Sequence, residues 1–150
     1  MFIYGKTATN AIAVMSYLVG VSPRRAGSEE IANARHISRT LTAKLLTQLS
    51  SAGLVMGQPG PGGGYTLGHQ ANEIRLMDIV SLFSSVGESS PCPFGSGWCG
   101  IGAPCPLHDT ISGLMACHRA FLENTRLSVF LTGGSVLPAL PPDPVLLPPA

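Results

Sequence analysis

The sequence contains no run of the roughly 18 uninterrupted apolar residues that a membrane helix needs, which excludes a membrane-spanning protein. Polar residues such as Asn10 and Ser16 interrupt the apolar stretch after Lys6, so we expect a cytoplasmic protein rather than a secreted one. Charged residues make up only 11% of the chain and hydrophobic residues 45%, a balance that excludes wholesale disorder. A length of 150 residues is typical of one domain with an apolar core.

Patterns typical of enzymes and of nucleotide-binding proteins are missing as well. No lysine follows Lys44, so the glycine-rich segment 57–64 lacks the Gly-Lys-Ser/Thr sequence that a phosphate-binding loop requires. No Ser/His/Asp arrangement and no pair of carboxylates stands at a useful spacing. We therefore expect neither a nucleotide cofactor nor catalysis.

Charge is unevenly distributed, although the formal net charge is only +1. Residues 1–57 contain six Lys/Arg and two Asp/Glu, whereas residues 58–150 contain three Lys/Arg and six Asp/Glu. A basic front and a mildly acidic back favour a polyanion-binding N-terminal part. The asymmetry is too small to establish nucleic-acid binding without further evidence.

Three of the four cysteines gather in one loop that is rich in proline and glycine. Six residues separate Cys92 from Cys99, five separate Cys99 from Cys105, and two separate Cys105 from His108. Three thiolates and one imidazole suit zinc or an iron–sulfur cluster, and the spacing is wider than the tight pairs of zinc ribbons. In the cytoplasm, cysteines grouped in this way more often bind metal or sense redox than form structural disulfides.

Helical periodicity dominates the first 53 residues. Capping residues and breakers set the limits of three predicted helices: from a cap at Thr7 or Thr9 to a point before Pro23, from Ser28 to Ala34, and from a cap at Ser38 to a stop at Gly53. Two strand-like runs, residues 54–56 and 65–67, follow, and the proline- and glycine-rich connection between them favours a β-hairpin.

Helix, turn, helix and hairpin is the order of a winged helix, in which the third helix enters the major groove of DNA and the hairpin lies along the neighbouring backbone or minor groove. This order predicts DNA contacts from the turn before the second helix, from the third helix and from the wing: Arg24, Arg25, Arg39, Thr40, Lys44, Thr47, Gln48, Gln58, Gly60, Gly62 and Gly63. The alternative is an ordinary amphipathic helix with a solvated polar face.

Two further helices are expected after the hairpin. The fourth is marked by apolar residues at helical spacing: Leu76, Ile79, Val80 and Phe83. An apolar stripe from Ile111 to Leu122 marks a long helix after His108, and pairing with the same helix of a second subunit would cover it. Cys117 and His118 lie on this helix and are interpreted as packing residues, with Cys117 as a reserve ligand.

The predicted fold class is mainly α with a small β-hairpin. We expect a winged helix-turn-helix DNA-binding region over residues 1–70, and a cluster-binding loop with a long C-terminal dimerisation helix over residues 71–132. Residues 133–150 are dominated by proline and are predicted to form a disordered tail, to which we assign no function.

These features together resemble the bacterial winged-helix iron–sulfur transcription regulators typified by IscR and NsrR, over about Lys6 to Leu131. The most specific matches are the wing motif Gly60-Pro61-Gly62-Gly63-Gly64-Tyr65, the preceding Gly53-Leu54-Val55, and the three cysteines after the fourth helix. The resemblance implies that the cysteines ligate an iron–sulfur cluster and that His108 completes a 2Fe-2S site, favoured over 4Fe-4S, as in the IscR branch. Other branches take an acidic residue from the partner's N-terminal helix, where Lys6, Thr7 and Ala8 stand in this chain.

Two departures from the family pattern affect these expectations. The gap between Cys92 and Cys99 is one residue longer than usual, and Gln58 and Pro59 stand where a basic residue normally precedes the wing glycines. Because phosphate neutralisation dominates non-specific affinity, we expect weak binding to random DNA with a shallow salt dependence. Five residues are then expected to carry most of the attraction: Arg24, Arg25, Arg35, Arg39 and Lys44.

The function implied is a homodimeric transcription regulator that binds a pseudo-palindromic operator in double-stranded DNA and senses redox, nitric oxide or iron–sulfur status through its cluster. Three alternatives stay open. They are a winged-helix DNA binder with a structural zinc, a metal-free thiol switch, and a small iron–sulfur electron-transfer protein.

Overall fold

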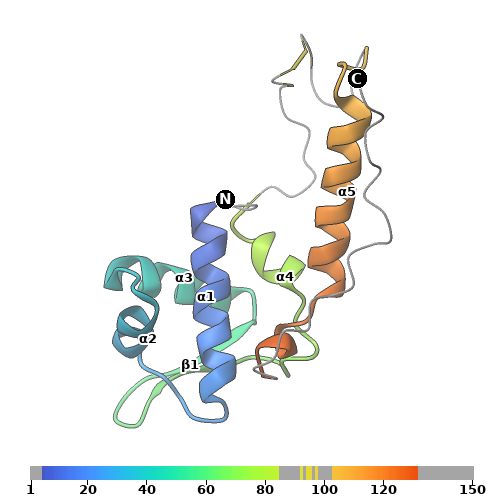
Figure 1. Ribbon diagram of the computed structural model, residues 1–150. Coiled ribbons are helices and arrows are strands. Elements are labelled where there is room, and N and C mark those ends of the chain that lie inside the picture. Colours follow the sequence, from blue (N-terminus) through green and yellow to red (C-terminus); the bar gives the residue numbers. More distant parts are fainter. Residues whose placement is uncertain (1–4, 85–91, 93, 96, 98–102, 132–150) are drawn as a thin grey trace.

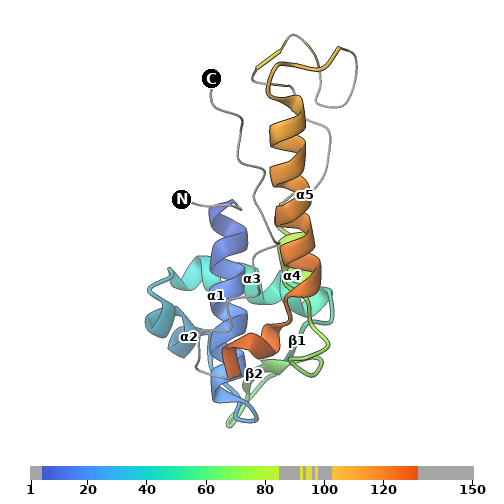
Figure 2. The same ribbon diagram turned by 45° about the vertical axis from the view of Figure 1, so that its right-hand side comes forward.

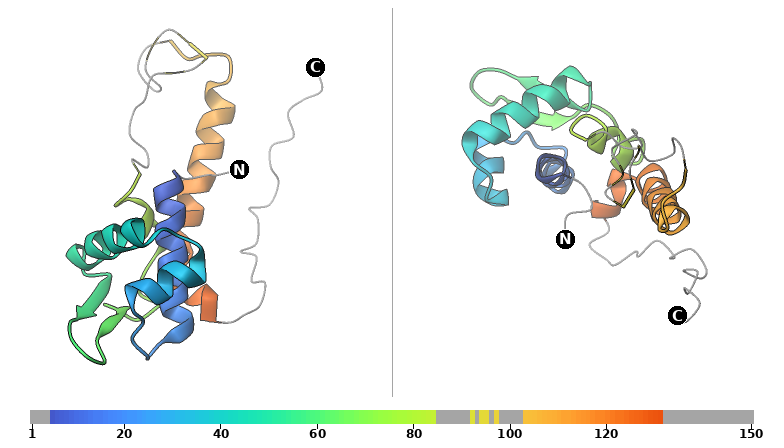
Figure 3. Two further views of the ribbon diagram at one scale, coloured as in Figure 1. Left: turned by 90° about the vertical axis from the view of Figure 1, so that its left-hand side faces the viewer. Right: turned by 90° about the horizontal axis from the view of Figure 1, so that it is seen from above.

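A computed structural model describes residues 5–84, 92, 94, 95, 97 and 103–131. Helix α1 (Lys6–Val21) stands at the centre, with α2 (Ser28–Arg35) and α3 (Arg39–Ser51) on one side and α5 (His108–Asn124) on the other (Figure 1). The view from above in Figure 3 shows the same arrangement. Cys99 and the predicted tail 133–150 lie outside the described residues.

The starts of the three N-terminal helices test the predicted caps. Gly5 precedes α1 and its carbonyl accepts the amide of Thr9 at 3.1 Å, so the prediction of a Thr7 or Thr9 cap is wrong. Helix α1 begins earlier because its buried face begins at Ala8. Ser38 caps α3 as predicted, since its hydroxyl accepts the amide of Leu41 at 3.3 Å.

The wing is an antiparallel hairpin of β1 (Val55–Gln58) and β2 (Gly64–Leu67), paired from Val55 with Leu67 to Gln58 with Gly64. Ala26 extends this hairpin, because its amide and carbonyl bond Tyr65 at 3.0 and 2.8 Å. Gly64 has a φ of +133°, and a Cβ there would lie 2.9 Å from the Ala26 carbonyl oxygen. Only glycine allows this approach without strain, so Gly64 fixes the wing against the turn before α2.

One apolar core joins the N-terminal and C-terminal parts of the chain. Met15 and Leu18 of α1 are buried together with Leu46 of α3 and with Leu122 and Leu127 from the C-terminal part. The core therefore crosses the boundary that we drew at residue 70, and α1 packs both on the helix-turn-helix side and on η1 (Leu127–Leu131).

Helix α5 is attached to this core only near its C-terminal end. The amide of Leu76 bonds the carbonyl of Thr125 at 3.0 Å, and the amide of Leu127 bonds the carbonyl of Ile74 at 2.8 Å. The N-terminal part of α5 projects beyond α1 (Figure 2), and Leu114 and Met115 on it are 63% and 49% exposed. The long predicted helix is thus present, with much of its apolar stripe uncovered.

The fourth predicted helix is shorter than expected. Helix α4 (Leu76–Val80) begins after Arg75, whose amide bonds the Asp78 carboxylate at 2.9 Å. It ends at Val80, so Phe83 lies in the following turn and packs on the core from there. The apolar residues at helical spacing therefore span a short helix and the turn that follows it.

Candidate nucleic-acid interface and cluster site

The solvent-facing side of α3 carries the predicted DNA contacts. Its buried side is formed by Leu45, Leu46 and Leu49, which pack into the core. Because a helix repeats every 3.6 residues, burying these leucines turns the polar residues outward. All five polar residues predicted on this helix are exposed: Arg39, Thr40, Lys44, Thr47 and Gln48.

The wing and the turn before α2 form the second part of this surface. The Ala26 bridge to Tyr65 places Arg24 and Arg25 at the root of the wing. Gln58 is exposed at the end of β1, followed by the wing-tip glycines Gly60, Gly62 and Gly63. Gly60 and Gly62 are exposed with φ values of +90° and +72°, and a side chain at Gly63 would clash with the carbonyl of Gln58.

Arg24 is held by an acidic residue of α2. Its guanidinium donates to both Glu30 carboxylate oxygens, at 2.6 and 3.1 Å, and the Tyr17 hydroxyl donates to Glu30 Oε1 at 2.7 Å. These hydrogen bonds, first that of Arg24 and then that of Tyr17, lower the pKa of Glu30 to about 2. The same carboxylate raises the pKa of the Tyr17 hydroxyl.

Two further arginines are also engaged within the protein. Arg39 forms an ion pair with Glu29, and Arg35 donates to the Ser16 hydroxyl at 3.0 Å while lying 5.5 Å from the centre of the Tyr17 ring. Of the five residues expected to attract DNA, Arg25, Arg35 and Lys44 form no ion pair with a described residue, and Arg35 is engaged by neutral groups instead.

The pairing of Glu29 and Glu30 with arginines was not predicted from the sequence. The signal that could have found them is that they are the only two carboxylates in residues 1–57, close in sequence to the paired arginines. The attraction available from Arg24 and Arg39 is therefore lower than their formal charge indicates.

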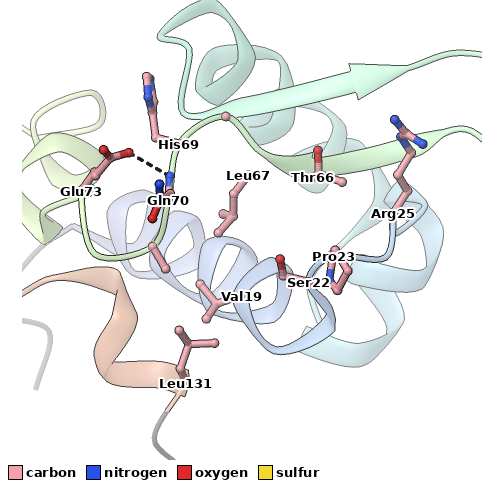
Figure 4. Close-up of a pocket in the computed structure, with 12 residues that line it drawn as sticks. Val19, Ser22, Pro23, Arg25, Thr66, Leu67, His69, Gln70, Glu73 and Leu131 are labelled. Atoms are coloured by element: carbon pink, nitrogen blue, oxygen red, sulfur yellow. Dashed lines mark hydrogen bonds between the residues drawn. The ribbon is translucent and has the colours of Figure 1, made fainter.

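A groove of about 750 Å³ lies beside the root of the wing, between the end of α1 and η1 (Figure 4). Val19, Leu67 and Leu131 form its apolar part, while Arg25 and His69 lie at its edges. In Figure 4 these two polar side chains point away from the apolar part and do not converge. Arg25 and His69 therefore do not form the converging pair of polar groups that is typical of a small-molecule site.

The cysteine loop meets α5 at the helix end that projects from the body. A Cβ placed on Gly95 would lie 3.2 Å from the Cys105 Cβ and 3.7 Å from the Cys92 sulfur, so both cysteines border the same glycine. Cys92 donates its amide to Gly97 at 2.8 Å, and His108, the first residue of α5, donates its amide to Cys105 at 3.0 Å. Two of the three loop cysteines thus lie together, one turn from His108.

The complete ligand set is not described. Cys99 falls outside the described residues, and among those described no three His, Cys, Asp or Glu side chains form a metal-binding group. The donors that are described, two sulfurs and one imidazole on adjacent backbone, are of the types that iron–sulfur clusters and zinc accept.

Cys117 and His118 differ in their surroundings. His118 is partly buried and burial lowers its pKa, in agreement with its interpretation as a packing residue. Cys117 is exposed, so its interpretation as a packing residue is wrong for this chain by itself. As a reserve ligand it is poorly placed, because it lies nine positions after His108 on α5, a rise of about 13.5 Å along the helix axis.

Comparisons with known proteins agree with this architecture. A family model described as Rrf2, an iron-dependent transcriptional regulator, matches residues 4–132. The chain belongs to the Rrf2 family. Rrf2-type relatives include a protein of Aquifex aeolicus (strain VF5) named as an HTH-type transcriptional regulator, which is 29% identical over 83% of this chain and 88% of its own length.

A second relative is the HTH-type transcriptional regulator IscR of Vibrio parahaemolyticus, 32% identical over 72% of this chain. The match spans 64% of the length of that relative. Both relatives are named as HTH-type transcriptional regulators, and this Rrf2-family chain is a transcription regulator.

Solved structures confirm the predicted fold class. CymR, described as the global cysteine regulator of B. subtilis, superposes with a TM-score of 0.73 at 19% identity, covering 89% of this chain and 99% of CymR. T. potens IscR superposes with a TM-score of 0.68 at 16% identity, covering 88% of each chain.

None of the described helices is both long enough and apolar enough to cross a membrane.

Proposed function

We propose that this Rrf2-family chain is a homodimeric, cytoplasmic regulator whose affinity for operator DNA depends on an iron–sulfur cluster. The observation that carries the proposal is the position of Cys92 and Cys105 around Gly95, one turn from His108 and at the projecting end of α5. This position links a metal-ligand set directly to the helix that we propose as the dimer interface.

The ligands proposed for the cluster are Cys92, Cys99, Cys105 and His108. Thiolates and one imidazole suit a 2Fe-2S cluster, which when bound supplies a redox-sensitive cross-link between the loop and α5. Gly95 leaves the space between the two described cysteines open, since a side chain there would contact both. Backbone hydrogen bonds hold both residues in place, since the Cys92 amide donates to the Gly97 carbonyl and the Cys105 carbonyl accepts the His108 amide.

DNA is proposed to contact α3 and the wing. The exposed side chains of Thr40, Lys44 and Gln48 offer hydrogen bonds to base edges or phosphates in the major groove. The wing tip, where Gly60 and Gly62 are exposed, allows close approach of backbone to the sugar–phosphate strand. Two copies related by a twofold axis would read two half-sites about one helical turn apart.

The dimer is proposed to form through the projecting part of α5. Leu114 and Met115 expose large apolar side chains there, and Leu107 adds another at the helix start. A symmetric pairing of two α5 helices would cover all three and would place two cysteine loops near the same interface.

The cluster is tested by oxygen-free purification followed by iron, acid-labile sulfide and zinc analysis. We expect iron and sulfide in equal amounts with visible absorption, and loss of both in Cys92→Ser, Cys99→Ser and Cys105→Ser. Cys117→Ser is the matched control and should retain the cluster. A colourless protein with one tightly bound zinc would establish the structural-zinc alternative instead.

A metal-free thiol switch is the second candidate, because Cys92 and Cys105 are two thiols of the same loop that border one glycine. The two candidates differ at His108. His108→Ala should alter the visible spectrum and the DNA response of a cluster protein, whereas a thiol switch would not respond to this substitution. Reversible redox without any sequence-specific DNA complex would instead indicate an electron-transfer protein.

A further inference from the structure

The two carboxylates of residues 1–57 both pair with arginines of the proposed DNA surface. Glu29 holds Arg39 at the start of α3, and Glu30 holds Arg24 at the root of the wing. Both come from α2, so one helix neutralises a cation on each of the two parts of that surface. Lys44 and Arg25, which have no such partner among the described residues, are left to attract phosphate.

The two pairs differ in their contribution to the fold. Glu30 also accepts the Tyr17 hydroxyl at 2.7 Å and so connects α2 to α1. Glu29 makes no described side-chain contact except with Arg39, and the two side chains are 61% and 71% exposed. Exposed ion pairs contribute little to stability, so the Glu29 pair is not explained by folding.

We propose that Glu29 is a specificity-determining residue that lowers the affinity for DNA of random sequence. Its carboxylate competes with phosphate for the Arg39 guanidinium and repels phosphate at the start of α3. Random duplex offers only phosphate contacts, so it loses a large part of its binding energy. An operator adds base contacts and is less affected in relative terms. This inference rests on the proposed DNA surface.

The test measures binding of a short random-sequence duplex to the full-length protein by fluorescence anisotropy at several salt concentrations. Glu29→Gln keeps the size and hydrogen-bonding capacity of the side chain and removes the charge. We expect the variant to bind random duplex about two- to fivefold more tightly at low salt. The slope of log affinity against log salt should become steeper by about one, because one further phosphate contact is made.

The matched control is Glu123→Gln. Glu123 pairs with Arg119 at 3.0 Å on α5, on the other side of α1 from α3, so this substitution frees an arginine and changes the net charge equally. It should leave the affinity and slope unchanged. In an Arg39→Gln background, Glu29→Gln should lose most of its effect, since the competing cation is absent.

Lys44→Gln separates failure of this inference from failure of the DNA surface. If Lys44→Gln weakens binding but Glu29→Gln changes the affinity no more than Glu123→Gln, the role of Glu29 is refuted while the surface stands. If neither Lys44→Gln nor Glu29→Gln changes the affinity, both the surface and the inference fail. Equal strengthening by Glu29→Gln and Glu123→Gln would show a net-charge effect only and would also refute the inference.

Discussion

The winged part of the molecule buries its apolar residues within one chain, whereas the projecting part of α5 exposes them. In the winged part, leucines of α3 are buried against α1, and hydrogen bonds from Ala26 secure the wing. On the projecting part, Leu114 and Met115 lie in solvent although they belong to a regular apolar stripe. The first region is complete within one chain, whereas the second has the composition of an interface.

This difference indicates where regulation can act. A region whose core side chains are packed within one chain has one stable arrangement, and its core holds the DNA-facing elements in fixed positions. The stability of a region that depends on a second chain and on loop ligands changes when that chain or those ligands bind or dissociate. Truncating a leucine or adding a methyl group at a glycine should therefore have different effects in the two regions.

The largest expected effect is that of Leu46→Ala. Leu46 is fully buried on α3, so truncation removes apolar contacts and leaves a cavity. We expect the free energy of unfolding to fall by about 2–5 kcal/mol, measured by chemical denaturation.

Leu114→Ala is the matched change on the projecting part. Because Leu114 is exposed in the single chain, unfolding measured at dilute concentration should change by less than about 0.5 kcal/mol. The dimer dissociation constant, measured by analytical ultracentrifugation, should rise instead. Equal losses of stability for both variants would show that the two regions do not differ in this way.

A smaller effect is expected from adding a methyl group at glycine. Gly64→Ala should destabilise by about 1–3 kcal/mol, because φ is +133° and the new Cβ would meet the Ala26 carbonyl. Gly113→Ala, inside α5 with no atom within 4 Å, should stabilise by up to about 1 kcal/mol through helix propensity. Thermal unfolding of both variants checks the opposite signs.

The smallest effect concerns the pH dependence from Glu30. Its pKa in the folded chain is about 2, below the ordinary value of 4.5, so the folded state favours the charged carboxylate. The stabilisation is therefore complete above about pH 5 and is lost as the pH falls towards 2. The difference in Tm between the natural chain and Glu30→Gln should shrink over that range. Tyr17→Phe, which removes one hydrogen bond, should shift the profile less than Glu30→Gln does.

Local patterns explain which parts of the fold could be predicted. The Ser38 cap, the leucine stripe of α3 and the glycine-rich hairpin are all set by residues close in sequence, and each was predicted. The prediction of the α1 cap was wrong. The sequence offered two threonines as capping residues, but the helix begins after Gly5, at a point set by where its buried face begins.

Contacts between distant residues explain what could not be predicted. The pairing of Ile74–Leu76 with Thr125–Leu127 joins segments some fifty residues apart, and no local pattern marks it. The ion pairs of Glu29 and Glu30 depend on how α2 packs beside α1 and α3. In the loop, the resemblance to known regulators predicted that the cysteines act together, and this stays a prediction, since the described residues show only that Cys92 and Cys105 border the same Gly95.

The attachment of α5 by its C-terminal end makes this helix a lever. Two backbone hydrogen bonds, Leu76 to Thr125 and Leu127 to Ile74, hold its foot, while 17 residues give it a length of about 25 Å. A tilt of 10° about the foot displaces the far end by about 4 Å. A small change in the tilt of α5 at its C-terminal end therefore produces a displacement of several ångströms beside Cys105 and His108.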